Sequence, residues 1–192
     1  MALWQEARKP FHGGQRCGAR PQPYRHDSPF IGVKRHPAFQ DLSRDHYIAL
    51  NRSLQVIRAD EGHAQAKPFD VAKVRFIDLW QHDGLRQHFL EEEADLIPVL
   101  RENGASGLAD RMRREHDVLR AAFAGLPSAT PGVAADSARL LTAHARWEEN
   151  VVFEWLQDHL LPQALHELLA RSQAFRQANG LPVEKKTSHS SL

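Results

Sequence analysis

Four long segments of this chain place apolar residues three and four residues apart, the spacing of one face of an α-helix. They span residues 38–60, 69–102, 107–126 and 135–159. A stripe with this period is stable only when it is buried against other helices. The second, third and fourth segments are joined by short or Pro- and Gly-rich links, which place successive helices antiparallel. We therefore predict an all-α protein, an up-down-up-down four-helix bundle with a short fifth helix after Pro162.

The chain changes in composition on both sides of this bundle, which we assign to residues 38–171. Residues 1–37 are rich in Pro, Gly and Arg without a helical period, which predicts an irregular N-terminal arm. Residues 172–192 are expected to form a polar C-terminal tail.

Charge and cysteine content exclude several classes of function. Lys and Arg (25) balance Asp and Glu (24), whereas a protein that binds nucleic acid electrostatically needs a basic excess. Cys17 is the only cysteine, so the chain has neither an intrachain disulfide nor a thiolate metal cluster. No apolar run reaches the ~18 residues of a membrane span, and the first residues lack the apolar run of a signal peptide. We expect a cytoplasmic protein with no nucleic-acid or membrane partner.

The helical segments each carry one histidine on the apolar stripe. These are His46, His88, His116 and His144, from a total of 12 histidines. Counted from the connecting loops at ~1.5 Å per residue, the four lie at nearly one depth in the bundle. A single histidine on an apolar face is usually a core residue with a local hydrogen bond. Four at a common depth fit that explanation poorly, and the other eight are predicted to be solvated.

Two of these histidines are followed, one helical turn later, by a glutamate on the same face: His88 by Glu92, and His144 by Glu148. A buried carboxylate without a counter-charge is costly, and the predicted inner faces offer no Lys or Arg. A metal cation would supply the missing charge.

The neighbouring polar residues are weaker candidates. Glu91 and Glu93 flank Glu92 and are predicted to face solvent, and Glu149 lies ~100° round the helix from Glu148, which makes it the runner-up ligand. Gln81 and Asp95 lie near the inward edge, where each could orient an imidazole or form a polar boundary.

Four imidazoles and two carboxylates, with no thiolate, suit iron or manganese and tolerate zinc. One octahedral ion could use all six donors, but two ions bridged by both carboxylates use them more naturally. Ferritin-like bundles use Glu-x-x-His and more carboxylate than imidazole. The order here is His-x-x-x-Glu, which argues against ferroxidase storage.

The ordered set of His46, "HFLEE", "EHDVL" and "HARWEE" resembles the hemerythrin-like, or HHE cation-binding, domain over roughly residues 36–170. The resemblance implies a four-helix bundle that holds two non-haem iron ions. It implies that Glu92 and Glu148 bridge the irons. It also assigns one histidine pair to each iron: His46 with His88, and His116 with His144.

Two departures separate the chain from the oxygen carriers of that family. Met112 stands where the carriers have a further histidine, and the last carboxylate of the carriers is an Asp one residue beyond Glu148. The chain is more similar to bacterial members linked to oxygen, nitric-oxide or iron sensing and to iron-centre repair, although residues 1–35 do not resemble the cysteine-containing domain of the repair proteins. We expect Met112 to pack against the centre without ligating it, which leaves a coordination position open.

The function expected from these residues is the binding or sensing of a small diatomic ligand such as oxygen or nitric oxide, or the handling of iron. One alternative is a di-iron redox enzyme that turns over peroxide or nitric oxide. Another is a metal-free helical interaction module.

Overall fold

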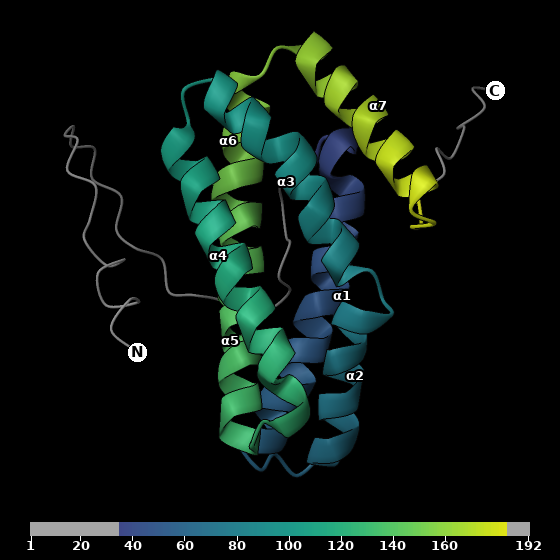
Figure 1. Cartoon of the computed structure of the whole chain (residues 1–192), viewed down its shortest axis with the longest axis vertical. Helices are drawn as coiled ribbons and strands as arrows, with labels where there is room; N and C mark the ends of the chain where they lie inside the picture. Colours follow the sequence, from purple (N-terminus) through teal and green to yellow (C-terminus); the bar gives the residue numbers. More distant parts are fainter. Residues whose placement is uncertain (1–34, 184–192) are drawn as a thin grey trace. The chain divides into compact units, whose positions relative to one another are not determined.

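The computed structural model describes residues 35–183, and this part of the chain is helical and contains no β-strand (Figure 1). Its α-helices are α1 (Pro37–Asp60), α2 (Phe69–Gln81), α3 (Leu85–Glu102), α4 (Ser106–Gly125), α5 (Pro131–Trp147), α6 (Phe153–His159) and α7 (Pro162–Ala178). A 3-10 turn, η3 (Leu126–Ser128), follows α4, and a π-helical turn, η4 (Glu148–Val152), joins α5 to α6. Residues 1–34 of the predicted arm and 184–192 of the predicted tail lie outside the described residues.

The four-helix bundle predicted from the sequence is confirmed. Its members are α1, the pair α2 and α3, α4, and the pair α5 and α6, and Figure 1 shows α7 lying across one end. His36 begins α1 because its Nδ1 accepts the N–H of Ala38 at 3.2 Å and Pro37 takes the first helical position, where a missing N–H costs nothing. None of the described helices is long and apolar enough to cross a membrane.

The second predicted helix, 69–102, is interrupted at Gly84, so the prediction of one continuous helix over this range was wrong. Gly84 has φ +91°, in the left-handed region, and a Cβ atom there would lie 3.0 Å from the Leu181 side chain. Only glycine adopts this conformation at little cost. The break lets α3 begin a new apolar face at Leu85, which is buried, whereas Val74 on α2 is 55% exposed.

The fourth predicted helix, 135–159, is continuous but contains the π turn. A π turn holds an extra residue, so the residues after it face a different direction from those of a regular α-helix. Val152, Phe153 and Leu156 are therefore buried, and Val151 is exposed.

The fifth helix is longer than predicted. Residues 172–178 belong to α7 rather than to a polar tail, and this last part buries Ser172 and Arg176.

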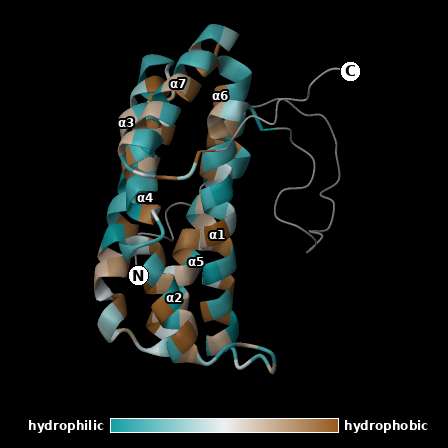
Figure 2. Ribbon diagram, turned by 90° about the vertical axis from the view of Figure 1, so that its right-hand side faces the viewer, coloured by the Kyte–Doolittle hydropathy of each residue, from teal (hydrophilic) through white to brown (hydrophobic). Residues whose placement is uncertain are grey.

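Two apolar clusters fill the bundle, one on each side of a polar layer. The first includes Phe39, Leu96, Met112 and Phe153, and the second includes Val56, Phe76, Phe89, Leu119 and Leu141. Figure 2 shows hydrophobic and hydrophilic segments alternating along the helices, as expected for amphipathic helices around a shared core. The four predicted histidines lie between the clusters.

Candidate metal centre

The structure brings the six residues singled out in the sequence to one layer of the core. All are buried, none being more than 2% exposed: His46 on α1, His88 and Glu92 on α3, His116 on α4, His144 on α5 and Glu148 at the start of the π turn. They form two overlapping groups whose donor atoms lie within 4.8 Å of one another: His46, His88, Glu92 and Glu148, and Glu92, His116, His144 and Glu148.

Glu92 divides its two oxygens between the histidine pairs. Its Oε1 lies 3.2 Å from His88 Nε2 and 3.8 Å from His46 Nε2. Its Oε2 lies 3.2 Å from His116 Nε2.

Glu148 divides its oxygens in the same way from the opposite side. Its Oε2 is 3.1 Å from His46 Nε2, and its Oε1 is 3.3 Å from His144 Nε2 and 3.8 Å from His116 Nε2. Ligands held ~2.0–2.2 Å from one metal ion are themselves about 3 Å apart. The closest of these N–O separations therefore match those within a coordination sphere.

Four carboxylates contact the other nitrogen, Nδ1, of the four histidines, one carboxylate for each. The Nδ1–O distances are 2.8 Å for His46–Glu149, 3.3 Å for His88–Asp45, 2.9 Å for His116–Glu93 and 2.9 Å for His144–Glu115. A neutral imidazole that donates from Nδ1 keeps its Nε2 lone pair free, so these contacts aim every Nε2 at the centre.

These four carboxylates form a closed ring around the bundle. Asp45 on α1 contacts the histidine of α3, Glu93 on α3 that of α4, Glu115 on α4 that of α5, and Glu149 after α5 that of α1. We name this set the carboxylate ring. Glu93 had been predicted to face solvent, which was wrong. Glu149, the runner-up ligand, contacts Nδ1 of His46 and so lies on the side of that imidazole that faces away from the inner carboxylates.

Arginines support every member of the carboxylate ring. Arg35 contacts Glu149 at 2.9 Å, Arg111 contacts Glu115 at 2.7 Å, Arg113 and Arg120 contact Glu93 at 2.8 and 2.7 Å, and Arg176 contacts Asp45. An ionised carboxylate is thereby favoured at each position, because the guanidinium groups supply both charge and hydrogen bonds.

Arg176 is the exception among these arginines because it is completely buried. Its Nε lies 3.0 Å from Oε2 of Glu91, and Ser172 donates to Glu91 Oε1 at 2.6 Å. The expectations that the core holds no cation and that Glu91 is solvated were therefore wrong. Asp95 pairs with Arg171 at 3.1 Å and Gln81 is exposed, so neither orients an imidazole.

The electrostatics of the inner layer indicate that a cation fits there. Both oxygens of Glu92 and of Glu148 are buried and accept no well-directed hydrogen bond from the described residues, which is costly for a carboxylate. Burial and the negative charge of Glu92 raise the pKa of Glu148 well above its usual value.

The histidine pKa values reflect the same uncompensated charge. Burial opposes protonation of His88 and His116, but Glu92, with Asp45 and Glu93, raises the pKa of each to about 9. At His144 burial prevails and lowers the pKa to about 4. Protons thus partly balance the carboxylates, and a metal cation, which binds the neutral imidazole, would replace them.

Met112 is fully buried in the apolar cluster that also contains Trp147 and Phe153. Apolar rings also cover two of the histidines: Phe89 stacks on His116 with ring centroids 4.1 Å apart, and Phe153 stacks on His46 at 5.6 Å.

Comparison with known proteins agrees with this geometry. The family model described as hemerythrin HHE cation binding domain matches residues 39–160, which include all six inner residues. Neither the curated proteins nor the solved structures searched gave a match. The residues present, their placement on four helices and this match together show that the chain belongs to the hemerythrin HHE cation-binding family.

Proposed function

We propose that this protein holds two non-haem iron ions and uses them to bind or sense a small diatomic ligand such as oxygen or nitric oxide. One observation carries the proposal: two groups of four buried donors share both carboxylates. A single ion would not require each carboxylate to direct one oxygen to each histidine pair. Imidazole and carboxylate donors without thiolate favour iron over softer metals.

The two histidine pairs would hold one ion each, and Glu92 and Glu148 would contact both. Each ion would then have four protein donors, two nitrogens and two oxygens. Six-coordinate iron would retain positions for an external ligand, as ligand binding requires. When bound, iron supplies a centre that can bind a diatomic molecule and change oxidation state.

The remaining residues of the centre orient the donors and limit access of water. The carboxylate ring holds the Nδ1 proton of each imidazole, and its partner arginines keep the ring ionised. Phe89 and Phe153 lie flat against His116 and His46, so apolar rings cover two imidazoles and restrict water there. Met112 would occupy space on the apolar side of the centre without ligating, because a thioether is a poor ligand in a site of nitrogen and oxygen donors.

Metal content tests the proposal directly. Protein purified with iron is expected to contain about two iron ions per chain, and His88→Ala and Glu148→Ala should each lose most of it. His63→Ala is the matched control, because the His63 side chain is 55% exposed and its imidazole pairs with Glu61. Full iron content in both centre variants would disprove the assignment.

Ligand binding is tested by adding azide or nitric oxide to the iron-loaded protein under exclusion of oxygen. We expect a shift in the charge-transfer absorption of the wild type. Turnover of peroxide or nitric oxide would instead indicate the redox-enzyme alternative. The cytoplasmic location and the absence of nucleic-acid and membrane partners stay predictions from the sequence.

A further inference from the structure

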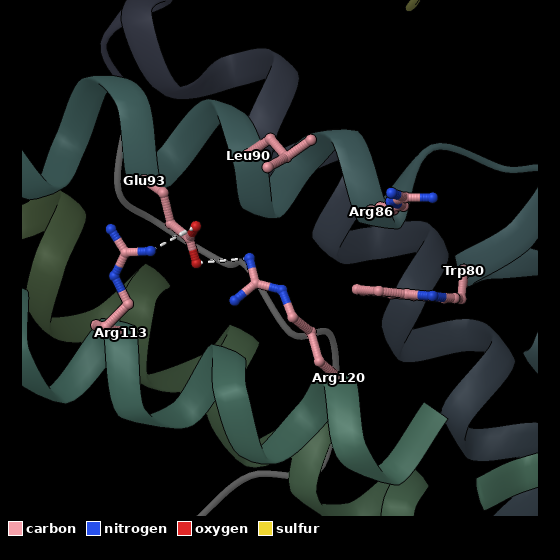
Figure 3. Close-up of a pocket in the computed structure, with 6 residues that line it drawn as sticks. All are labelled: Trp80, Arg86, Leu90, Glu93, Arg113 and Arg120. Carbon is pink, nitrogen blue, oxygen red and sulfur yellow. Dashed lines mark hydrogen bonds and ion pairs between the residues drawn. The ribbon is translucent and has the colours of Figure 1, made fainter. Parts of the chain in front are cut away.

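A pocket of about 450 Å³ opens beside α3 and α4, and none of the six inner donors lines it. Its lining residues come from three helices: Trp80 on α2, Arg86, Leu90 and Glu93 on α3, and Arg113 and Arg120 on α4. Figure 3 shows Glu93 between Arg113 and Arg120, with Trp80 and Arg86 at the other end of the pocket. The pocket therefore has a charged half and a half with an aromatic wall.

The charge in this pocket is predominantly positive. Three guanidinium groups face one carboxylate, and Glu93 is already shared by Arg113 at 2.8 Å and Arg120 at 2.7 Å. Arg86 is exposed and forms no ion pair with any residue in the described part of the chain. Arg120 also pairs with Asp117 at 3.2 Å, so three guanidinium charges meet two carboxylates and one positive charge is left over. Planar guanidinium groups bind the oxygens of phosphates and carboxylates well.

The apolar wall indicates what else the occupant should contain. Trp80 is held in place by Phe89 and Phe123, with ring centroids 5.6 and 5.3 Å away, and Leu90 is 45% exposed. An aromatic ring or short apolar group beside the anion would cover both side chains. Inorganic phosphate would leave them in water.

The pocket is connected to the metal centre through Glu93. The same oxygen, Oε1, accepts from Arg120 and lies 2.9 Å from His116 Nδ1. An anion that binds Arg113 and Arg120 would weaken their hold on Glu93, which would then interact more strongly with His116. Such contacts to the second nitrogen tune the donor strength of a metal-binding imidazole.

We propose that this pocket binds a small organic anion, an aryl phosphate or an aryl carboxylate, and that its occupancy is communicated through Glu93 to His116. Binding of the anion requires only the pocket and does not require iron at the centre. The communication step rests on the proposed function, because it requires iron at the centre.

Calorimetric titration of the purified full chain with phenyl phosphate tests the binding step. We expect saturable binding that is weaker for inorganic phosphate and for phenol, and about 10-fold weaker in Arg86→Gln and in Arg113→Gln, the loss expected for one charged hydrogen bond. Arg114→Gln is the control, because Arg114 is also exposed, neighbours Arg113 and does not line the pocket. No binding up to about 10 mM, equal binding of inorganic phosphate, or equal losses in the control would overturn the proposal.

The iron-loaded protein tests the communication step. Saturating phenyl phosphate should shift the charge-transfer absorption of the wild type and of Arg114→Gln but not of the Arg86→Gln, Arg113→Gln double variant. Calorimetric binding without any shift in loaded protein would overturn the communication step. A chain that takes up no iron would instead overturn the proposed function, while the calorimetric result would still decide the binding step.

Discussion

Replacing Arg176 with methionine should destabilise the protein in a way that depends on pH. The substitution keeps the length and apolar stem of the side chain but removes the only cation that contacts Glu91 among the described residues. Glu91 is 1% exposed and cannot be rehydrated in place. Breaking a buried ion pair by removing one partner commonly costs about 3–5 kcal/mol.

Protonation of Glu91 sets an upper limit on this cost. Starting from its usual pKa of 4.5, protonating the carboxyl requires about 3.4 kcal/mol at pH 7 but only about 0.7 kcal/mol at pH 5, at 1.36 kcal/mol per pH unit. Burial already raises the pKa of Glu91 in the wild type. A folded-state pKa above the unfolded value means that stability falls as pH rises, so the loss in Arg176→Met should grow between pH 5 and pH 7.

Urea unfolding followed by circular dichroism at the two pH values measures the effect. We expect a loss of about 3 kcal/mol at pH 7 and about 0.7 kcal/mol or less at pH 5, and recovery of most of the pH 7 loss when Glu91→Gln is added. Arg171→Met is the matched control on the same helix, because Arg171 is half exposed and its pair with Asp95 should contribute under about 1 kcal/mol.

Iron affinity gives a second readout of the same substitution. Arg176 contacts Asp45, which contacts His88, so Arg176→Met should weaken iron binding about 10–100-fold, whereas Arg176→Lys should retain part of the affinity and Arg171→Met all of it. A loss of stability below about 1 kcal/mol at pH 7, or an equal loss at both pH values, would refute this reasoning.

Three further predictions concern the centre itself. Verified removal of the metal should lower Tm by at least about 5 °C, because a cation bound only to the folded state stabilises it, and an unchanged Tm in scanning calorimetry would point to a peripheral site. In the metal-free protein, burial opposes ionisation of Glu93 but His116 and Arg120 lower its pKa to about 2. The stabilisation that ionised Glu93 gives the folded protein is therefore complete above the usual pKa of 4.5 and is lost as pH falls toward 2. Glu93→Gln should lower the free energy of unfolding by about 1–3 kcal/mol at pH 6 and by almost nothing near pH 2. Urea unfolding at both pH values would measure this difference. Met112→His should weaken azide binding to the iron-loaded protein by filling the open position, and identical azide affinities in spectral titrations would show that no such position exists beside Met112.

The inner layer of the centre was predictable from the sequence because helical spacing fixes direction. A residue four positions after His88 or His144 must share its face, so Glu92 and Glu148 followed from periodicity alone. Depth in an antiparallel bundle also follows from distance to the connecting loop, which placed all four histidines in one layer.

The carboxylate ring could not be predicted in the same way. Each of its members is adjacent in sequence to an inner donor: Asp45, Glu93, Glu115 and Glu149 beside His46, Glu92, His116 and Glu148. An adjacent residue points ~100° away, and whether that direction meets solvent or the next helix depends on the order of helices around the bundle. Arg176 was missed for a related reason, since only the docking of α7 places it in the core.

Local backbone geometry accounts for the other errors. The break occurs at Gly84, which has a positive φ, and the π turn spans Glu148–Val152, and neither follows from the apolar period of the segment. The π turn buries two consecutive glutamates, Glu148 and Glu149, an arrangement that a regular helix with 100° between residues disfavours. Helical spacing therefore made Glu149 only the runner-up ligand and did not predict its contact with His46 Nδ1.

The closed order of the carboxylate ring has a mechanical consequence. Each of α1, α3, α4 and the α5 segment both orients the histidine of the next helix and has its own histidine oriented by the preceding one. No helix is terminal in such a cycle, so displacing any one of them breaks two contacts. The middle turns of all four should therefore open together, and amide hydrogen exchange there should proceed at one common rate rather than in a graded sequence from the outer to the inner helices.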